Sequence, residues 1–327
     1  MASIRHRNGR WQARVIREGH PAQVKTFDSK LDAERWARNI ESEMDKGHFV
    51  SLAEAHRTTL RDVILRYLQE VTPTMKSARE DAIRLRAMAS RKVASWSLAN
   101  LTPARLASYR DERLKQVHPA TVIRELSYLS AIINHARREW GIAISNPVAL
   151  IRKPPTPKAR TRVLSAEERV RLLAALEPTS RRNPWIRPLV ILALETAMRR
   201  GELLALRWEN IDMTLCTAYL PDTKNGSARA VPLSSAAIAC LRALPRSITG
   251  EVFPLKHFSA DKAFKRAVQR AGIVDLRFHD LRHTAISAMA QKLPNIIELS
   301  AVSGHKSLAM LKRYYHVSAA ELAKKLG

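Results

Sequence analysis

The spacing of apolar residues most constrains the fold of this chain, because two different periods occur along it. Apolar and polar residues alternate in short runs near the N-terminus and at residues 215–220 and 228–233, which predicts strands. Elsewhere apolar residues recur at helical spacing, which predicts amphipathic helices. The 327 residues exceed the ~100–200 of a typical domain. We therefore expect a mainly α fold with small β elements, divided over two or three domains.

Residues 1–50 predict a three-stranded antiparallel sheet followed by one helix. The run at residues 11–15 alternates, and Asn8-Gly9 is a turn signal ahead of it. Ser29, with Asp32 three residues later, is suited to begin the helix, and Gly47 to end it. The sheet part carries five arginines, which either enter a groove of DNA or form a solvated basic face: Arg5, Arg7, Arg10, Arg14 and Arg17.

Residues 52–151 predict an all-helical domain. Thr102 is a suitable N-cap ahead of Pro103, and Gly141 ends a long apolar stripe that begins at Val122. Core packing accounts for the apolar residues of these helices. The arginines between them are candidates for contact with phosphate: Arg61, Arg66, Arg84, Arg86 and Arg91.

Residues 152–162 predict an extended linker. They include three prolines and five basic residues and show no apolar periodicity. The linker is either a simple tether or a strap along a DNA backbone, with four candidate contacts: Arg152, Lys153, Lys158 and Arg160. Residues 163–327 follow as a mixed α/β domain, which a capping box at Ser165 and Glu168 opens.

The charge of the chain predicts its partner. Lysine and arginine total 56 against 30 aspartate and glutamate, which gives a formal net charge of +26. This excess creates a positive field over the surface and favours nucleic acid as the partner. Aromatic residues make up 6% of the chain, which argues against serial base stacking on single strands. Double-stranded DNA contacted through its phosphates is therefore expected.

The sequence predicts neither a membrane span nor a secretory signal. The most apolar run, residues 188–194, is far shorter than the ~20 residues that a span needs. The basic N-terminus has no apolar stretch behind it. Cys216 and Cys240 have neither metal-site nor disulfide spacing. We expect a cytoplasmic protein that is associated with the nucleoid.

Four short stretches of the third segment together suit one kind of chemistry. They lie at residues 195–203, 223–226, 278–283 and 304–316. Breaking a phosphodiester while keeping its energy requires a covalent intermediate, which a tyrosine oxygen can form. Arginines suit the charge that builds on the phosphate oxygens, and a lysine or histidine can protonate the departing oxygen. This chemistry requires no metal and no cofactor.

A zinc site is the main alternative for part of this set. His279 and His283 are four positions apart on an expected helix, as in zinc-binding pairs. The zinc-protease pattern has glutamate directly after the first histidine, where this chain has Asp280, and Arg282 between the two would repel a dication. We therefore expect no metal.

At these positions the sequence resembles the tyrosine recombinase or phage integrase family. Residues 196–203 resemble its first-arginine box, with Glu202 as the supporting acidic neighbour, and residues 223–226 match its hairpin. The resemblance implies six catalytic residues: Arg199, Lys224, His279, Arg282, His305 and the nucleophile Tyr314. It also implies a 3′-phosphotyrosine intermediate and a homotetramer on two DNA sites. The need for a directionality factor as a further partner stays open.

Two adjacent pairs need a choice. Arg199 fits the box better than Arg200 because Gly201 and the residues after it must follow. Tyr314 fits better than Tyr315 because a histidine follows two positions later.

Three nearby residues are expected to have no direct role in the chemistry. Ala197 stands where the family often has glycine, which is expected to affect helix packing. His283 and His316 are expected to be structural or supporting.

Residues 137–326 resemble shufflon-type DNA invertases most closely, whereas residues 1–50 resemble the arm-binding or accessory domain of phage and genomic-island integrases. Integration, excision and inversion all stay open. A type IB topoisomerase, or a DNA-binding protein with a degenerate site, is the alternative function.

Overall fold

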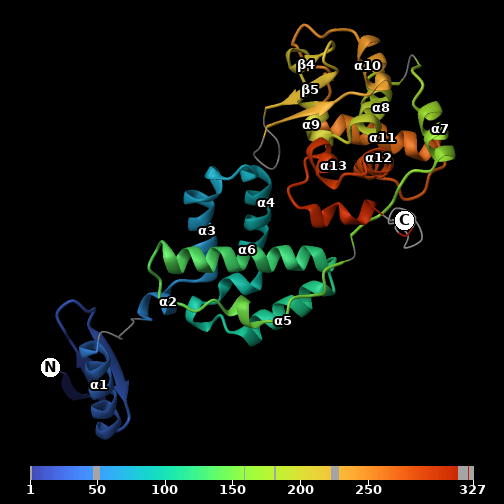
Figure 1. The fold of residues 1–327 in the computed structure, drawn as a ribbon. Helices are drawn as coiled ribbons and strands as arrows, with labels where there is room; N and C mark the ends of the chain where they lie inside the picture. Colours follow the sequence, from blue (N-terminus) through green and yellow to red (C-terminus); the bar gives the residue numbers. More distant parts are fainter. Residues whose placement is uncertain are drawn as a thin grey trace. The chain divides into compact units, whose positions relative to one another are not determined.

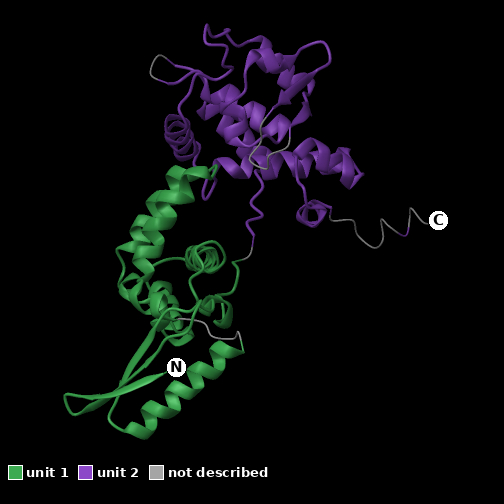
Figure 2. Cartoon of the chain, turned by 90° about the vertical axis from the view of Figure 1, so that its left-hand side faces the viewer, with its two compact units in different colours: residues 1–158 green, residues 159–327 purple. Residues whose placement is uncertain are grey.

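The computed structural model describes residues 2–46, 52–157, 159–179, 182–221, 228–315 and 323. The chain divides into two compact units, residues 1–158 and 159–327 (Figure 2). Helices make up most of both units, and each unit has one small antiparallel sheet (Figure 1). The predicted fold class is therefore confirmed.

The N-terminal sheet has the order β1-β2-β3. Its strands, and the helix that follows them, are β1 (Ser3–Arg7), β2 (Arg10–Val15), β3 (Gln23–Phe27) and α1 (Lys30–Asp45). Arg7 pairs with Arg10, so Asn8 and Gly9 form a two-residue hairpin loop. Both have positive φ, 51° and 77°, as the primed turn of a tight hairpin requires.

Helix α1 covers one face of this sheet (Figure 1). Ala13 and Val15 of β2 are buried against Ala33 and Ala37 of the helix. Ser29 is the N-cap residue, as predicted, although its side chain makes no capping hydrogen bond. Helix α1 ends at Asp45, and Gly47, predicted to end it, lies outside the described residues.

The opposite face of the sheet is rich in arginine. Side chains alternate along a strand, and residues that pair across strands share a face. The pairing of Ser3 with Arg14, Arg5 with Gln12 and Arg7 with Arg10 therefore sets four arginines on the face away from α1. All four are exposed: Arg5, Arg7, Arg10 and Arg14.

A helical layer follows in the same unit. Its α-helices are α2 (Ala53–Arg57), α3 (Leu60–Glu70), α4 (Ala78–Ala89), α5 (Pro103–Leu114) and α6 (Pro119–Arg138). Its 3-10 helices are η1 (Thr72–Thr74), η2 (Lys92–Ser95), η3 (Leu98–Asn100) and η4 (Pro147–Leu150). The Thr102 hydroxyl accepts a hydrogen bond from the Arg105 amide, which confirms the predicted N-cap of α5. Gly141 has a φ of 68° just after α6, where the predicted stripe ends.

The second unit is mostly helical. Its α-helices are α7 (Ala166–Ala175), α8 (Ile186–Thr196), α9 (Arg200–Leu204), α10 (Ser235–Arg242), α11 (His257–Arg270), α12 (Phe278–Lys292) and α13 (Ile296–Ser303). Its 3-10 helices are η5 (Trp208–Asn210), η6 (Leu308–Met310) and η7 (Lys312–Tyr314). Its antiparallel sheet consists of β4 (Ile211–Asp212), β5 (Thr217–Leu220) and β6 (Arg229–Pro232). Strand β4 is an addition to the prediction. The predicted capping box of α7 is present, with Ser165 and Glu168 bonded reciprocally.

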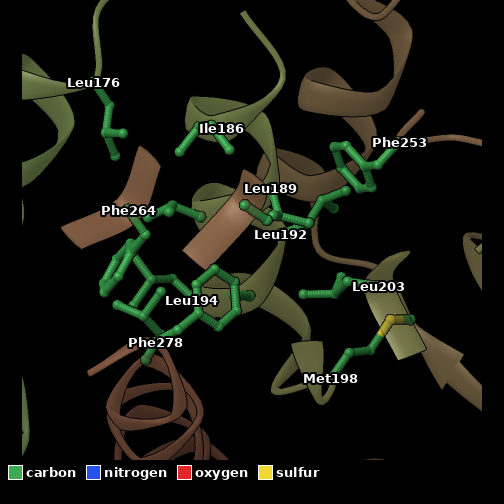
Figure 3. Packing of buried hydrophobic residues seen from close by; sticks show 14 of the residues in the cluster. Leu176, Ile186, Leu189, Leu192, Leu194, Met198, Leu203, Phe253, Phe264 and Phe278 are labelled. Carbon is green, nitrogen blue, oxygen red and sulfur yellow. The ribbon is translucent and has the colours of Figure 1, made fainter. Parts of the chain in front are cut away.

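Helix α8 lies at the centre of this unit and fixes the elements that carry the candidate site. It packs against α10, α11 and α12, and its residues Leu189, Leu192 and Leu194 are buried. The rings of Phe264 on α11 and Phe278 on α12 meet edge to face, with centroids 5.2 Å apart (Figure 3). The C-terminal end of α8 is therefore held against α12 by a continuous apolar core. None of the helices in the described ranges is long and apolar enough to cross a membrane.

Candidate active site

Glu202 joins two arginines at the start of α9. The backbone after α8 turns through Ala197 in the left-handed region, with a φ of 54°, and Arg199 becomes the N-cap of α9. The Arg199 Nη1 lies 2.7 Å from Glu202 Oε1, and the Arg199 amide donates to Oε2 at 2.9 Å. Arg229 of β6 donates to both oxygens of the same carboxylate, at 3.2 and 2.8 Å.

The Glu202 carboxylate is ionised despite its burial. Its exposed fraction is 7%. Burial alone raises the pKa of Glu202, but hydrogen bonds from Arg229 and from the amide and side chain of Arg199 lower it to about 2. The charge therefore persists at neutral pH and holds the Arg199 guanidinium in place.

Arg282 is buried on α12 and bridges two segments. Its Nη1 donates to the Ala197 carbonyl at 2.5 Å and its Nη2 to the Ser303 carbonyl at 2.6 Å. Burial and the nearby charge of Arg199 lower the pKa of Arg282 to about 10, so the guanidinium stays protonated at neutral pH. The structure thus gives Ala197 a part in the site beyond the packing effect expected from the sequence, because its carbonyl holds Arg282.

His305 follows α13, which Gly304 ends with a φ of 67°. Its Nδ1 lies 2.8 Å from the Ser303 hydroxyl and 3.4 Å from Arg282 Nη2. Burial and the charges of Arg282 and Arg199 lower the pKa of His305 to about 4, which makes it a neutral donor or acceptor at neutral pH.

Tyr314 ends η7 and contacts His283, which was expected from the sequence to be structural or supporting. Its hydroxyl is hydrogen-bonded to the Nδ1 of His283, one turn after His279 on α12. The neighbouring Tyr315 donates its hydroxyl to the Leu293 carbonyl at 2.7 Å. The Tyr315 hydroxyl is therefore occupied by a backbone carbonyl, whereas the Tyr314 hydroxyl faces a histidine.

The other two predicted catalytic residues are placed differently. His279 is exposed in the first turn of α12, and its ring meets that of His283 edge to face at 5.2 Å. Lys224 lies outside the described residues. The structure therefore brings Arg199, Arg282 and His305 together. The pair of His283 and Tyr314 lies beside them, and the charge of Arg282 acts to lower the pKa of both His305 and Tyr314.

The predicted phosphate contacts of the linker have different outcomes. Arg160 is bound to carboxylates of its own unit, with Nε 2.8 Å from Asp280 and Nη1 2.8 Å from Asp275. The guanidinium therefore has acidic partners in this structure, and its contact with DNA stays a prediction. Arg152 and Lys153 are exposed. Lys158 lies outside the described residues.

Sequence reasoning missed the role of Arg229. Its side chain is 11% exposed, and its guanidinium would lie 2.6 Å from a Cβ on Gly304. Arg229 therefore packs β6 against the turn that carries His305 while it holds Glu202. The sequence around Arg229 predicts a strand, but it does not reveal Glu202 as the partner of Arg229, because the two residues are 27 positions apart.

Comparison with known proteins identifies the family. The Phage integrase family profile matches residues 162–321, and the Phage integrase, N-terminal domain profile matches residues 56–153. The Shufflon-specific DNA recombinase of Escherichia coli is 39% identical over 279 residues, which span 83% of this chain and 72% of that protein. The chain belongs to the phage integrase family. Phage integrases of this kind are tyrosine recombinases, which cut and rejoin DNA at specific sites, so the predicted enzyme class is confirmed.

Two further relatives extend the comparison of this phage integrase. A putative integrase/recombinase of Haemophilus influenzae is 34% identical over 328 residues, which span 97% of this chain and 87% of that protein. The crystal structure of a lambda integrase dimer bound to a COC′ core site matches with a TM-score of 0.65 and 23% identity. That match covers 95% of this chain and 93% of the lambda chain, and it supports the fold.

Proposed function

We propose that this phage integrase cleaves double-stranded DNA by attack of the Tyr314 hydroxyl on a phosphate, which leaves a 3′-phosphotyrosine and a free 5′-hydroxyl. The observation that carries the proposal is the cluster of Arg199, Arg282 and His305 next to Tyr314. These groups have the charge and the donors that bind a phosphate, and Tyr314 has the oxygen that attacks it.

Each phosphate ligand is held by a different support. Arg282 is anchored by two carbonyls, and Arg199 by the Glu202 carboxylate. A guanidinium with fixed orientation loses little freedom when it binds phosphate and stabilises the charge that grows on the oxygens during attack. The Arg199 side chain is 20% exposed, so it is open to a phosphate at the surface.

The departing 5′-oxygen needs a proton, and we assign it to Lys224. Lys224 lies outside the described part of the chain. Its role is therefore argued from the family resemblance and from its position in the sequence between β5 and β6. His279, in the first turn of α12, assists in phosphate binding. A 5′-hydroxyl of the partner duplex then reverses the step and joins the strands. None of these steps calls for a metal or a cofactor.

The remaining segments serve DNA binding in this proposal. Residues 52–151 form the core-binding domain, residues 152–162 the linker with Arg152 and Lys153, and residues 163–327 the catalytic domain. The N-terminal sheet, residues 1–50, binds accessory or arm-type DNA through the face that carries four exposed arginines. Strands inserted into a groove make such contacts in other DNA-binding proteins.

Recombination of two duplexes requires four active sites. Lambda integrase has been solved as a tetramer bound to a Holliday junction, and this supports a homotetramer on two DNA sites. A directionality factor would then select integration or excision. The 39% sequence identity to a shufflon-specific DNA recombinase supports DNA inversion as the alternative to integration and excision.

The direct test is covalent capture of DNA. Tagged wild-type protein and the Tyr314→Phe variant are incubated with sheared DNA of the source genome, denatured in detergent and recovered, and the attached DNA is sequenced. We expect a specific site from the wild type and none from the variant. Equal recovery from both would refute the role of Tyr314.

A second arm separates a recombinase from a topoisomerase. Two duplexes that carry the captured site should yield recombinant joints. Relaxation of a supercoiled plasmid without joints would favour the topoisomerase. The new 5′ end should accept label from polynucleotide kinase without prior dephosphorylation.

A further inference from the structure

We infer that His283 is the general base of the reaction: its Nδ1 accepts the Tyr314 proton as the tyrosine attacks DNA and returns it when the strands are rejoined. This inference rests on the proposed function, because it needs Tyr314 to be the nucleophile. It assigns a catalytic role to a histidine outside the six residues that the family resemblance implies.

The geometry carries the inference. The Nδ1 of His283 is within hydrogen-bond distance of the Tyr314 hydroxyl, the atom that must lose a proton. The two rings lie nearly parallel, with 27° between their planes and centroids 6.0 Å apart. His283 directly follows Arg282 on α12, so one rigid helix carries both a phosphate ligand and the proposed base.

The other histidine close to the arginines is already engaged. His305 directs its Nδ1 to the Ser303 hydroxyl and to Arg282 Nη2, and its backbone carbonyl accepts the Ser300 hydroxyl at 2.6 Å. A ring held in this way is suited to donate from Nε2 to a phosphate oxygen, whereas the Tyr314 hydroxyl is hydrogen-bonded to His283. His283 is therefore the better base.

The groups that face His283 keep it neutral. Burial, His279, Arg313 and Arg282 lower its pKa below the ordinary 6.5, and Asp280 acts in the opposite direction. A neutral imidazole with its proton on Nε2 presents a lone pair at Nδ1. At neutral pH the ring is therefore ready to accept a proton.

The phenol needs this help. Burial raises the pKa of Tyr314 above its ordinary 10.0, although Arg313 and Arg282 oppose the rise. Unassisted ionisation at neutral pH is therefore unfavourable. A base in contact with the hydroxyl removes the proton as the bond to phosphorus forms, so no free phenolate has to accumulate.

The transfer balances in both directions. In cleavage the O–H bond of Tyr314 breaks, its oxygen bonds to phosphorus, and the proton passes to Nδ1. The bond from phosphorus to the 5′-oxygen breaks, and the oxygen leaves with a proton from Lys224. In rejoining, the incoming 5′-hydroxyl returns a proton to Lys224, and the His283 imidazolium protonates the departing Tyr314 oxygen.

The informative variant is His283→Asn. The Asn Oδ1 occupies nearly the position of Nδ1, so the variant can keep the hydrogen bond to Tyr314 but cannot hold a proton near neutral pH. Gln291→Asn, at an exposed position of the same helix, controls for the effect of asparagine on helix stability. Cleavage rates are measured on the duplex captured by the wild type, at saturating protein.

A second substrate separates the base from the acid. In this duplex the 5′-bridging oxygen of the cleaved phosphate is replaced by sulfur, which leaves without a proton. Lys224→Ala should be slow on the oxygen duplex and recover on the sulfur duplex. His283→Asn should lose about 10²–10⁴-fold in cleavage rate on both duplexes, the usual contribution of a general base.

The pH profile supplies the readout that a purely structural role would not move. The wild-type rate should be level near neutral pH and fall below the ordinary histidine pKa of 6.5, as His283 becomes protonated. The rate of His283→Asn should keep rising with pH past about 10, because burial raises the pKa of the Tyr314 phenol above its ordinary value.

Three results would overturn the inference. They are a His283→Asn rate within about tenfold of wild type, recovery of this variant on the sulfur duplex, or an unchanged pH profile. Absence of covalent DNA from the wild type on all genomic fragments would instead overturn the proposed function itself, and the inference with it.

Discussion

The substitution Gly304→Ala should destabilise the C-terminal unit by two separate effects. Gly304 has a φ of 67°, and an alanine in the left-handed region costs about 1–2 kcal/mol. The new Cβ would lie 2.6 Å from Nη1, 2.8 Å from Cζ and 3.0 Å from Nε of Arg229. These contacts are too close, so Arg229 must move.

Arg229 cannot move freely, because its guanidinium is bonded to both oxygens of Glu202. Its displacement should break at least one charge-assisted hydrogen bond, worth about 1.5–3 kcal/mol. The two effects together amount to about 2.5–5 kcal/mol. Arg199 shares the Glu202 carboxylate, so the loss should also reduce the rate of DNA cleavage.

The matched control is Gly272→Ala. Gly272 lies in the same unit with a φ of 62°, but its nearest new contact is Arg171 Nη1 at 4.0 Å. It therefore has the backbone strain without the clash. Hydrogen exchange of peptides from α8 and α12 in the full chain reports the free energy of opening. We expect Gly304→Ala to be less stable than the control by about 1.5–3 kcal/mol. Equal losses in the two variants would refute the role assigned to Arg229.

Three further predictions follow from other contacts. Glu202 has a pKa of about 2 in the folded chain against an ordinary 4.5. Its ionised form should therefore contribute on the order of 3 kcal/mol to the free energy of unfolding above pH 4.5, and this contribution is lost as the pH falls toward 2. Glu202→Gln should flatten that part of the curve of stability against pH, and an unchanged curve would contradict the ion pairs. Arg160→Met should lower the melting temperature of the protein and leave its affinity for the captured DNA site nearly unchanged, because Arg160 binds Asp275 and Asp280. Weaker DNA binding by a variant as stable as the wild type would instead show that Arg160 contacts DNA. Replacing Arg5 or Arg14 singly by alanine should lower the salt dependence of DNA binding by about one unit of slope per lost phosphate contact. Lys25→Ala removes one charge from the helix-facing side of the sheet and is the charge-matched control, and equal effects would argue against binding through the arginine face.

Much of the fold could be predicted because its signals are local. The Asn8-Gly9 turn sets its hairpin by backbone preference, and the reciprocal bonds of Ser165 and Glu168 involve residues three apart. Ser29 begins α1 as its position predicts, but the sequence does not reveal that its side chain makes no capping hydrogen bond. The two-residue strand β4 is too short for an alternating pattern.

The site could be located from sequence because its motifs are short and ordered, but its internal contacts could not. His283 and Tyr314 are 31 positions apart, and Arg160 and Asp280 are 120 apart. The first contact depends on how α12 packs against η7, and the second on how the segment before α7 meets α12. No local pattern encodes either arrangement. The sequence shows that His279 and His283 are four positions apart, but only the structure shows that His283 is the one hydrogen-bonded to Tyr314.

Mass spectrometry of the covalent complex can show whether Tyr314 is the residue joined to DNA. The complex is digested with nuclease and protease, and fragmentation locates the residual nucleotide within the peptide that contains both tyrosines. Tyr315→Phe is the control, since the Tyr315 hydroxyl bonds to the Leu293 carbonyl. We expect the nucleotide on Tyr314 in the wild type and in this control. A nucleotide on Tyr315, or on any other residue, would contradict it.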